Sequence, residues 1–143
     1  IAINHFKKKK IKGNIIFLSS TYGVVGPDHS LYKGLSKKKN IYGGTFSLTT
    51  PVSYTVSKSG IIGLMKYLAT SFGKFNIRIN CLTPGGVFDK QEIKFVKKYK
   101  SKVPLRRMAN FQDYNGAILF LASDASSYMT GSNLIIDGGW TAW

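Results

Sequence analysis

Three short apolar segments constrain the fold of this chain more than any other feature. They read GNIIFLSS (13–20), NIRINCLTPGG (76–86) and SNLIIDGG (132–139). The first is a continuous apolar run, which suits a strand that is covered on both faces. Segments with helical spacing of apolar residues separate the three runs, at 51–73, at 89–100 and at about 111–123. This alternation of strands and helices predicts an α/β fold built on a parallel sheet.

The helix predicted at 51–73 has recognisable features at its start and in its middle. Thr50 can cap the first turn, and Pro51 suits the first helical position because its missing N–H needs no partner there. Two glycines inside the helix, Gly60 and Gly63, would each cost about 1 kcal/mol if that part of the helix were exposed. We therefore expect another helix to pack closely against them.

The stretch at 21–50 shows neither strand nor helix spacing. It is rich in glycine and contains a run of three lysines. Clusters of this kind are typical of turns and irregular segments. We predict a loop or insertion without a strand between the first apolar run and the long helix.

Length and composition fit one folded domain. The 143 residues are 43% hydrophobic and 19% charged, which is not typical of a disordered chain. No apolar run approaches the roughly 20 residues that cross a bilayer, and residues 1–12 lack the pattern of a signal peptide. The single cysteine, Cys81, has no partner for an internal disulfide or a metal site. We expect a cytoplasmic protein without a membrane segment or a bound metal.

The formal net charge of +15 raises the question of a nucleic-acid partner. Only three of the 21 basic residues are arginines, the residue type that reads bases and phosphates in a bidentate way. Lys90, Lys94, Lys97 and Lys98 recur at helical spacing, as on a solvated helix face. We therefore favour a lysine-rich surface and predict no nucleic-acid partner.

Tyr54 and Lys58 are the first candidates for chemistry. Residues four apart share one face of a helix, so both side chains project from the start of the helix at 51–73. A lysine charge one turn away stabilises a phenolate, which makes tyrosine a usable acid or base. Ser19 and Ser20 end the first apolar run, at the strand end where parallel sheets bind ligands. The Pro84–Val87 turn ends the second run at the same edge.

At this point the sequence resembles the short-chain dehydrogenase/reductase family, over residues 11–139. The matching segments are the strand that ends in Ser19-Ser20, YTVSK (54–58), NIRINCLTPGGV (76–87), VPLRRM (103–108), ILFLASDASSYMTG (118–131) and IIDGGW (135–140). The segment SSTYGVVGPDHSLYKG (19–34) is similar to oxidoreductases associated with bacterial surface-sugar and flagellin-glycan pathways.

The resemblance implies a fold and a set of roles. The fold would be the C-terminal part of a Rossmann-like, doubly wound parallel sheet, with about three strands and flanking helices. Tyr54 would be the general acid/base on the substrate oxygen, Ser20 would hydrogen-bond that oxygen, and Ser19 is the alternative for this second role. Lys58 would hold the nicotinamide ribose and act on Tyr54. Helices such as the one at 51–73 usually pair across subunits in this family, which implies a homo-oligomer.

The same resemblance implies a cofactor, NAD or NADP, and a small-molecule alcohol or ketone as substrate. Pro84, Gly85, Gly86 and Val87 would lie along the nicotinamide, where glycines permit close backbone approach. The family's glycine-rich pyrophosphate turn, TGxxxGxG, matches nothing in this chain. We therefore expect a partial domain (1–143) that corresponds to the catalytic half of such an enzyme and is inactive alone. The alternatives are a non-catalytic remnant that associates with an intact homologue, and a basic nucleic-acid binder.

Two regions differ in length or position from a minimal family member. Ser20 and Tyr54 are 34 residues apart, where many members have a little over a dozen. The insertion at 21–50 either shapes a sugar-type substrate pocket or is a tolerated surface loop. Its polar candidates for substrate contact are Tyr22, Asp28, His29, Tyr32 and Tyr42, of which we favour Tyr22. Residues 87–110 are expected to form the substrate-loop region.

Overall fold

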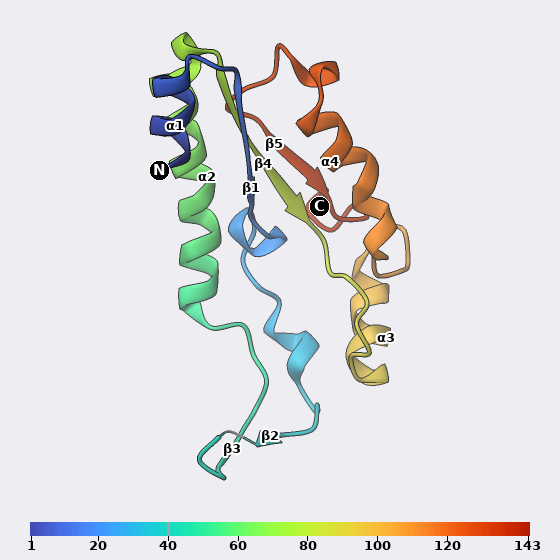
Figure 1. Ribbon diagram of the computed structural model, residues 1–143. Helices are drawn as coiled ribbons and strands as arrows, with labels where there is room; N and C mark the ends of the chain where they lie inside the picture. The colour runs from blue at the N-terminus through green and yellow to red at the C-terminus, as the bar shows by residue number, and fades with distance from the viewer. Residues whose placement is uncertain (40) are drawn as a thin grey trace.

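The computed structural model describes residues 1–39 and 41–143. A three-stranded parallel sheet forms its centre (Figure 1). The strands are β1 (Gly13–Leu18), β4 (Ile77–Pro84) and β5 (Asn133–Ile136). Their order is β1-β4-β5, so β4 is the central strand. The predicted α/β class and parallel sheet are thus confirmed.

The register of the sheet places the ends of β1 and β4 beside each other. Leu18, the last residue of β1, pairs with Leu82, and Pro84 at the end of β4 pairs with Ile136 of β5. The backbone N–H of Ser19 continues the ladder by donating to the Leu82 carbonyl at 2.9 Å. Residues that follow β1 and β4 therefore emerge at the same edge, the carboxyl edge of the sheet.

Within residues 1–39 and 41–143, four α-helices and five short 3₁₀ turns surround the sheet. The α-helices are α1 (Ala2–Lys9), α2 (Val52–Phe72), α3 (Ile93–Lys102) and α4 (Asn115–Ala122). The 3₁₀ turns are η1 (Thr21–Gly23), η2 (His29–Tyr32), η3 (Gly73–Phe75), η4 (Phe111–Tyr114) and η5 (Asp124–Ser126). In Figure 1, α1 and α2 lie on one side of the sheet and α4 lies on the other.

The alternation of side chains along β4 explains this layering, because neighbouring residues of a strand point to opposite faces. Ile77, Ile79 and Cys81 pack with Met65 and Ala69 of α2 in one buried cluster. On the opposite face, Leu82 packs with Ala117 and Leu121 of α4. Both faces of the central strand are therefore covered. Ile15 and Phe17 of β1 pack against the first cluster and Ile16 packs against the second, so β1 is also flanked on both faces, as its continuous apolar run predicts.

The observed helix starts correct three details of the sequence interpretation. Thr50 does not cap α2, because its hydroxyl is 2.8 Å from the Tyr32 hydroxyl and Pro51 occupies the N-cap position. The helix expected from residue 89 begins only at Ile93, after a turn in which Lys90 has a φ of 55°. The helix expected from about residue 111 begins as η4 and becomes α-helical at Asn115.

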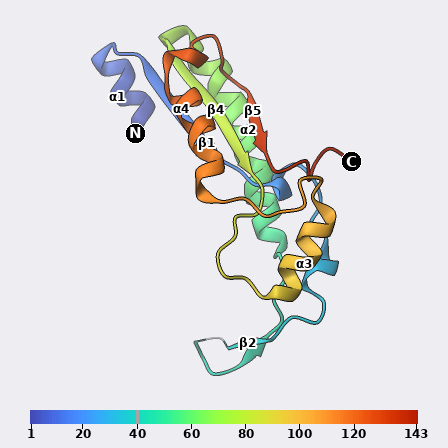
Figure 2. The ribbon, with the colours of Figure 1, turned by 90° about the vertical axis from the view of Figure 1, so that its right-hand side faces the viewer.

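The segment at 21–50 contains more regular structure than a loop. Besides η1 and η2, it holds an antiparallel pair of two-residue strands, β2 (Lys38–Lys39) and β3 (Thr45–Phe46). The prediction that no strand lies here is therefore wrong. Both short strands are exposed, so they are held together by their pairing with each other and not by burial. Figure 2 shows α3 and the β2–β3 pair beyond the carboxyl edge of the sheet.

Within residues 1–39 and 41–143, no helix combines the length and hydrophobicity that a membrane crossing requires. In the same described residues, His, Cys, Asp and Glu side chains do not gather in threes that could hold a metal ion.

Candidate active site

A cavity of about 470 Å³ opens at the carboxyl edge of the sheet. Its walls come from the ends of β1 and β4, the start of α2, the segment at 21–50, and α3 with the residues around it. The lining residues are Ser19, Ser20, Thr21, Tyr22, Tyr32, Thr49, Thr50, Pro51, Tyr54, Pro84, Gly85, Gly86, Val87, Gln91, Phe95, Tyr99 and Met108. The structure thus brings Ser20, Tyr22, Tyr54 and the Pro84–Val87 turn to one cavity, whereas Lys58 is not part of its lining.

Tyr54 and Lys58 project from the first two turns of α2. The Tyr54 side chain lines the cavity and remains partly accessible, at 39% exposure. The Lys58 ammonium lies 5.7 Å from the centre of the Tyr54 ring, and it donates a hydrogen bond to the Leu18 carbonyl at 3.0 Å. Lys58 therefore ties α2 to the end of β1 and places a positive charge near the Tyr54 ring.

The two serines after β1 have different hydrogen-bond partners. The Ser19 hydroxyl donates to the Lys58 carbonyl at 2.8 Å, so its proton is used inside the protein. The Ser20 hydroxyl accepts from the Tyr22 backbone N–H at 3.2 Å and caps η1. Because a hydroxyl has one proton and two lone pairs, Ser20 can still donate into the cavity. This difference favours Ser20 over Ser19 as the residue that holds a substrate oxygen.

The Pro84–Val87 turn is held by hydrogen bonds on nearly all of its backbone groups. Gly85 donates to the Ile136 carbonyl at 2.8 Å, Gly86 donates to the Tyr99 hydroxyl at 2.6 Å, and the Gly86 carbonyl accepts from Ala109 at 2.9 Å. Among the described residues, the Val87 N–H donates no hydrogen bond. Val87 lines the cavity. The turn therefore offers one unused donor to a ligand that carries a carbonyl or carboxamide oxygen.

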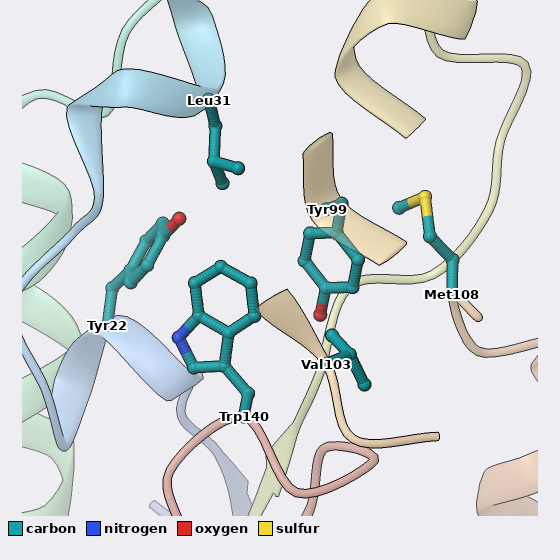
Figure 3. Close-up of a cluster of buried hydrophobic side chains, with 6 residues drawn as sticks. All are labelled: Tyr22, Leu31, Tyr99, Val103, Met108 and Trp140. Carbon is teal, nitrogen blue, oxygen red and sulfur yellow. The ribbon is translucent and has the colours of Figure 1, made fainter. Parts of the chain in front are cut away.

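An apolar and aromatic cluster forms the wall next to this turn. It consists of Tyr22, Leu31, Tyr99, Val103, Met108 and Trp140 (Figure 3). Burial raises the pKa of Tyr22 and of Tyr99, and it raises the pKa of the nearby Tyr114 to about 12. These three phenols stay protonated at neutral pH, so they can hydrogen-bond but do not carry protons between groups. Tyr22, our sequence candidate for substrate contact, lines the cavity but is 9% exposed.

The segment at 21–50 is anchored onto α3 and the start of α2. The Lys98 ammonium donates to the carbonyls of Ser30 and Lys33, at 3.0 and 2.6 Å. Lys102 forms an ion pair with Asp28 at 2.8 Å. Lys98 was expected on a solvated face, and that expectation is wrong, because its charge is used to hold this segment. The segment is thus a built wall of the cavity.

Several cavity residues were not singled out from the sequence. They are Thr49, Thr50, Gln91, Phe95, Tyr99 and Met108. Their positions depend on how α3 and the segment at 21–50 fold back over the carboxyl edge, which no local pattern encodes. The one available signal was the aromatic content of the segment around α3. Of the earlier candidates for sugar contact, Asp28, His29 and Tyr42 are not part of the lining.

Comparison with known proteins agrees with this architecture. Residues 38–141 match the family described as enoyl-(acyl carrier protein) reductase. Many solved structures resemble this fold, among them a short-chain dehydrogenase with bound NAD⁺. The chain belongs to the short-chain dehydrogenase/reductase family.

Three individual relatives show how similar the chain is to known proteins and how much of each it covers. The chain is 36% identical to post-translational flagellin modification protein A of Campylobacter coli, over 94% of this chain and 48% of that protein. It is 42% identical to a ribulose-forming D-arabinitol 2-dehydrogenase of Candida tropicalis, over 63% of this chain and 35% of that protein. A short-chain dehydrogenase of Leptospira borgpetersenii with bound NAD⁺ superposes with a TM-score of 0.85 at 39% identity, over 97% of this chain and 48% of that one. The chain spans about half the length of the relatives it matches most fully.

Proposed function

We propose that this chain carries the catalytic residues of an NAD- or NADP-dependent oxidoreductase that interconverts an alcohol and a ketone. The observation that carries the proposal is the convergence of Ser20, Tyr54 and the unused Val87 N–H on one cavity. A hydroxyl donor, an acid/base phenol and a carboxamide site are the parts that such a reaction needs.

Tyr54, Ser20 and Lys58 have different roles in the proposed reaction. Tyr54 gives a proton to the substrate oxygen during ketone reduction and takes it back during alcohol oxidation. Ser20 donates a hydrogen bond to the same oxygen and holds it near Tyr54. Lys58 holds the end of β1 against α2 and keeps its charge 5.7 Å from the Tyr54 ring centre.

The residues present fit the nicotinamide end of the cofactor. Val87 N–H and the Pro84–Val87 backbone would hold the nicotinamide carboxamide, and Lys58 would contact the ribose. When bound, the cofactor supplies the hydride acceptor or donor, and the protein supplies orientation and electrostatics. The related Leptospira protein holds NAD⁺, while residues that would select between NAD and NADP are not identified in this chain.

The cavity lining supports a sugar-type substrate. Among the described residues that line it, none carries a charged side chain. Thr49, Thr50 and Tyr32 contribute hydroxyl-bearing side chains to the lining, and Phe95 contributes an aromatic ring that can contact C–H groups. A neutral polyhydroxylated compound satisfies both features. The arabinitol dehydrogenase relative acts on such a compound.

We also propose a homo-oligomer formed through α2. Exposed small and apolar residues recur along one side of this helix, at Val56, Gly60, Gly63, Leu64 and Tyr67, which we call the α2 strip. A side chain added at Gly60 or Gly63 would meet nothing within 4 Å. Glycines that leave this much space permit the close approach of a second helix.

A buried, unpaired Cys81 supports a reducing, cytoplasmic location.

A hybrid enzyme tests the proposal directly. Residues 1–143 would replace the matching 48% of the Leptospira dehydrogenase, which supplies the remaining part of an NAD⁺ site. The hybrid is expected to oxidise pentitols with formation of NADH, and Tyr54→Phe is expected to lower kcat by a factor on the order of 100 to 10,000 while NADH affinity stays within about twofold. Tyr128→Phe, at a fully exposed tyrosine, is the matched control. A folded, NADH-binding hybrid that is inactive, or that ignores Tyr54→Phe, would refute the proposal.

A further inference from the structure

Tyr99 connects two walls of the cavity that belong to different elements. It lies on α3, whose neighbouring residues Gln91 and Phe95 line the cavity on the substrate side. Its hydroxyl accepts the Gly86 N–H at 2.6 Å, which is a short bond to the turn on the cofactor side. The Tyr99 side chain is 6% exposed. Because this buried side chain belongs to α3 and bonds to Gly86, it holds the two walls in a fixed position relative to each other.

The ring of Tyr99 is fixed by its aromatic neighbours. It stacks on Trp140 with 4.9 Å between ring centres and 18° between planes, and the Phe95 ring is also stacked with it at 6.1 Å between ring centres. Tyr22 meets the edge of Trp140 at 6.4 Å. Figure 3 shows Tyr22, Trp140 and Tyr99 side by side. Burial raises the pKa of Tyr99, so the hydroxyl stays neutral and remains a constant partner for Gly86.

The turn is shaped to receive this tyrosine. A Cβ added at Gly86 would lie 2.8 Å from Cζ of Tyr99, so only glycine permits the contact. The Gly86 carbonyl is held by Ala109, on the same peptide unit that carries the Val87 N–H. Because the C=O and N–H of a trans peptide point in opposite directions, the Ala109 bond sets the direction of the Val87 N–H, and the Tyr99 bond fixes the peptide just before it.

We propose that Tyr99 is a positioning residue that holds Gly86 and thereby aims the Val87 N–H at the nicotinamide carboxamide. This inference rests on the proposed function. It adds that α3 contributes to the cofactor side of the cavity through one buried hydroxyl. Tyr99 acts only through Gly86 and Val87, and it takes no part in proton transfer.

The test uses the ¹⁵N-labelled 143-residue chain and nicotinamide mononucleotide, a probe that contains only the end of the cofactor that this turn would hold. In the wild-type chain, the Gly86 amide is expected to exchange with solvent at least about tenfold more slowly than the unpartnered Val87 amide. Titration with the probe is expected to shift the Val87 resonance. Tyr99→Phe, which keeps the ring and removes the oxygen, is expected to abolish the protection of Gly86 and weaken probe binding about tenfold.

Two variants separate this effect from a general loss of structure. Tyr128→Phe removes an exposed hydroxyl and should change neither measurement. Tyr32→Phe removes the bond between that hydroxyl and the Thr50 hydroxyl and should leave Gly86 protected. A Gly86 amide that exchanges as fast as Val87 in the wild type overturns the inference, as does probe binding that Tyr99→Phe leaves unchanged. If the wild-type chain shows no shift at Val87, the proposed cofactor site itself is wrong.

Discussion

Ser19 and Ser20 are adjacent in sequence, but the structure gives their hydroxyls different surroundings. Ser19 donates to the Lys58 carbonyl, whereas Ser20 keeps its proton available to the cavity. We expect Ser20→Ala to lower kcat of the hybrid enzyme on the order of 100-fold, because the substrate oxygen loses a donor. Ser19→Ala should leave kcat within about threefold and reduce the free energy of unfolding by about 1 kcal/mol.

Steady-state kinetics and urea unfolding on the two variants measure both effects. The pair is its own control, since each removes one oxygen from the same dipeptide. The reverse result, a loss of kcat with Ser19→Ala alone, would assign the substrate oxygen to Ser19.

Local sequence signals could place some of these residues and not others. The end of an apolar run locates Ser20, and i,i+4 spacing puts Tyr54 and Lys58 on one helix face; both are properties of short segments. Tyr99 differs, because its importance comes from a hydrogen bond to Gly86 and from stacking on Trp140, far along the chain. Nothing near Tyr99 in the sequence distinguishes it from a tyrosine on an ordinary amphipathic helix.

At the scale of elements, the ion pair between η2 and α3 gives the cavity wall a dependence on pH. Lys102 and the Ser30 N–H lower the pKa of Asp28 from its usual 3.8 to about 2. A carboxyl whose pKa is lower in the folded state adds stability above its unfolded pKa and loses it as the pH falls through its folded pKa. The contribution of Asp28 is therefore complete at neutral pH and disappears between 3.8 and about 2.

We expect Asp28→Asn to reduce the free energy of unfolding by about 1 kcal/mol or less at pH 7, since the pair is partly solvated. The difference between wild type and variant should vanish as the pH approaches 2. Urea unfolding at a series of pH values measures this, with Asp124→Asn, at an exposed carboxyl outside the two ion pairs of the described residues, as the control. A difference that stays constant down to pH 2 would contradict the assignment.

The elements themselves were predictable to different degrees. The three strands and α2 follow from apolar patterning, and their positions agree with the expectation within a few residues. The start of α3 could not be predicted from apolar patterning. The turn before it is set by a hydrogen bond from the Asp89 N–H to the Gln91 side chain and by the left-handed conformation of Lys90. The β2–β3 pair was missed because two-residue strands are too short to show alternation.

At the scale of the whole molecule, the α2 strip gives a specific test of assembly. Gly63→Leu should be tolerated within one chain, where nothing lies within 4 Å, and leucine is a better helix former than glycine. It should nevertheless prevent a second helix from approaching closely. We expect light scattering to give the mass of an oligomer for the wild-type chain and the mass of one chain for Gly63→Leu.

Gly116→Leu provides the matched control. Gly116 is also an exposed helical glycine with open space around it, but it lies on α4, away from the α2 strip. An identical mass for wild type and Gly63→Leu would exclude this strip as the interface.

The parallel register of the sheet has a consequence for how quickly the protein can fold. β4 lies between two partners that are distant along the chain, as the hydrogen bond between Thr83 and Asn133, 50 residues apart, illustrates. Large loops must close before any strand gains a neighbour, so rates of folding fall as such separations grow. We expect α2 to form early from local contacts, whereas the stacking of Tyr99 on Trp140 joins residues 41 positions apart and needs a large loop to close. The aromatic wall of the cavity is therefore expected to form late in folding.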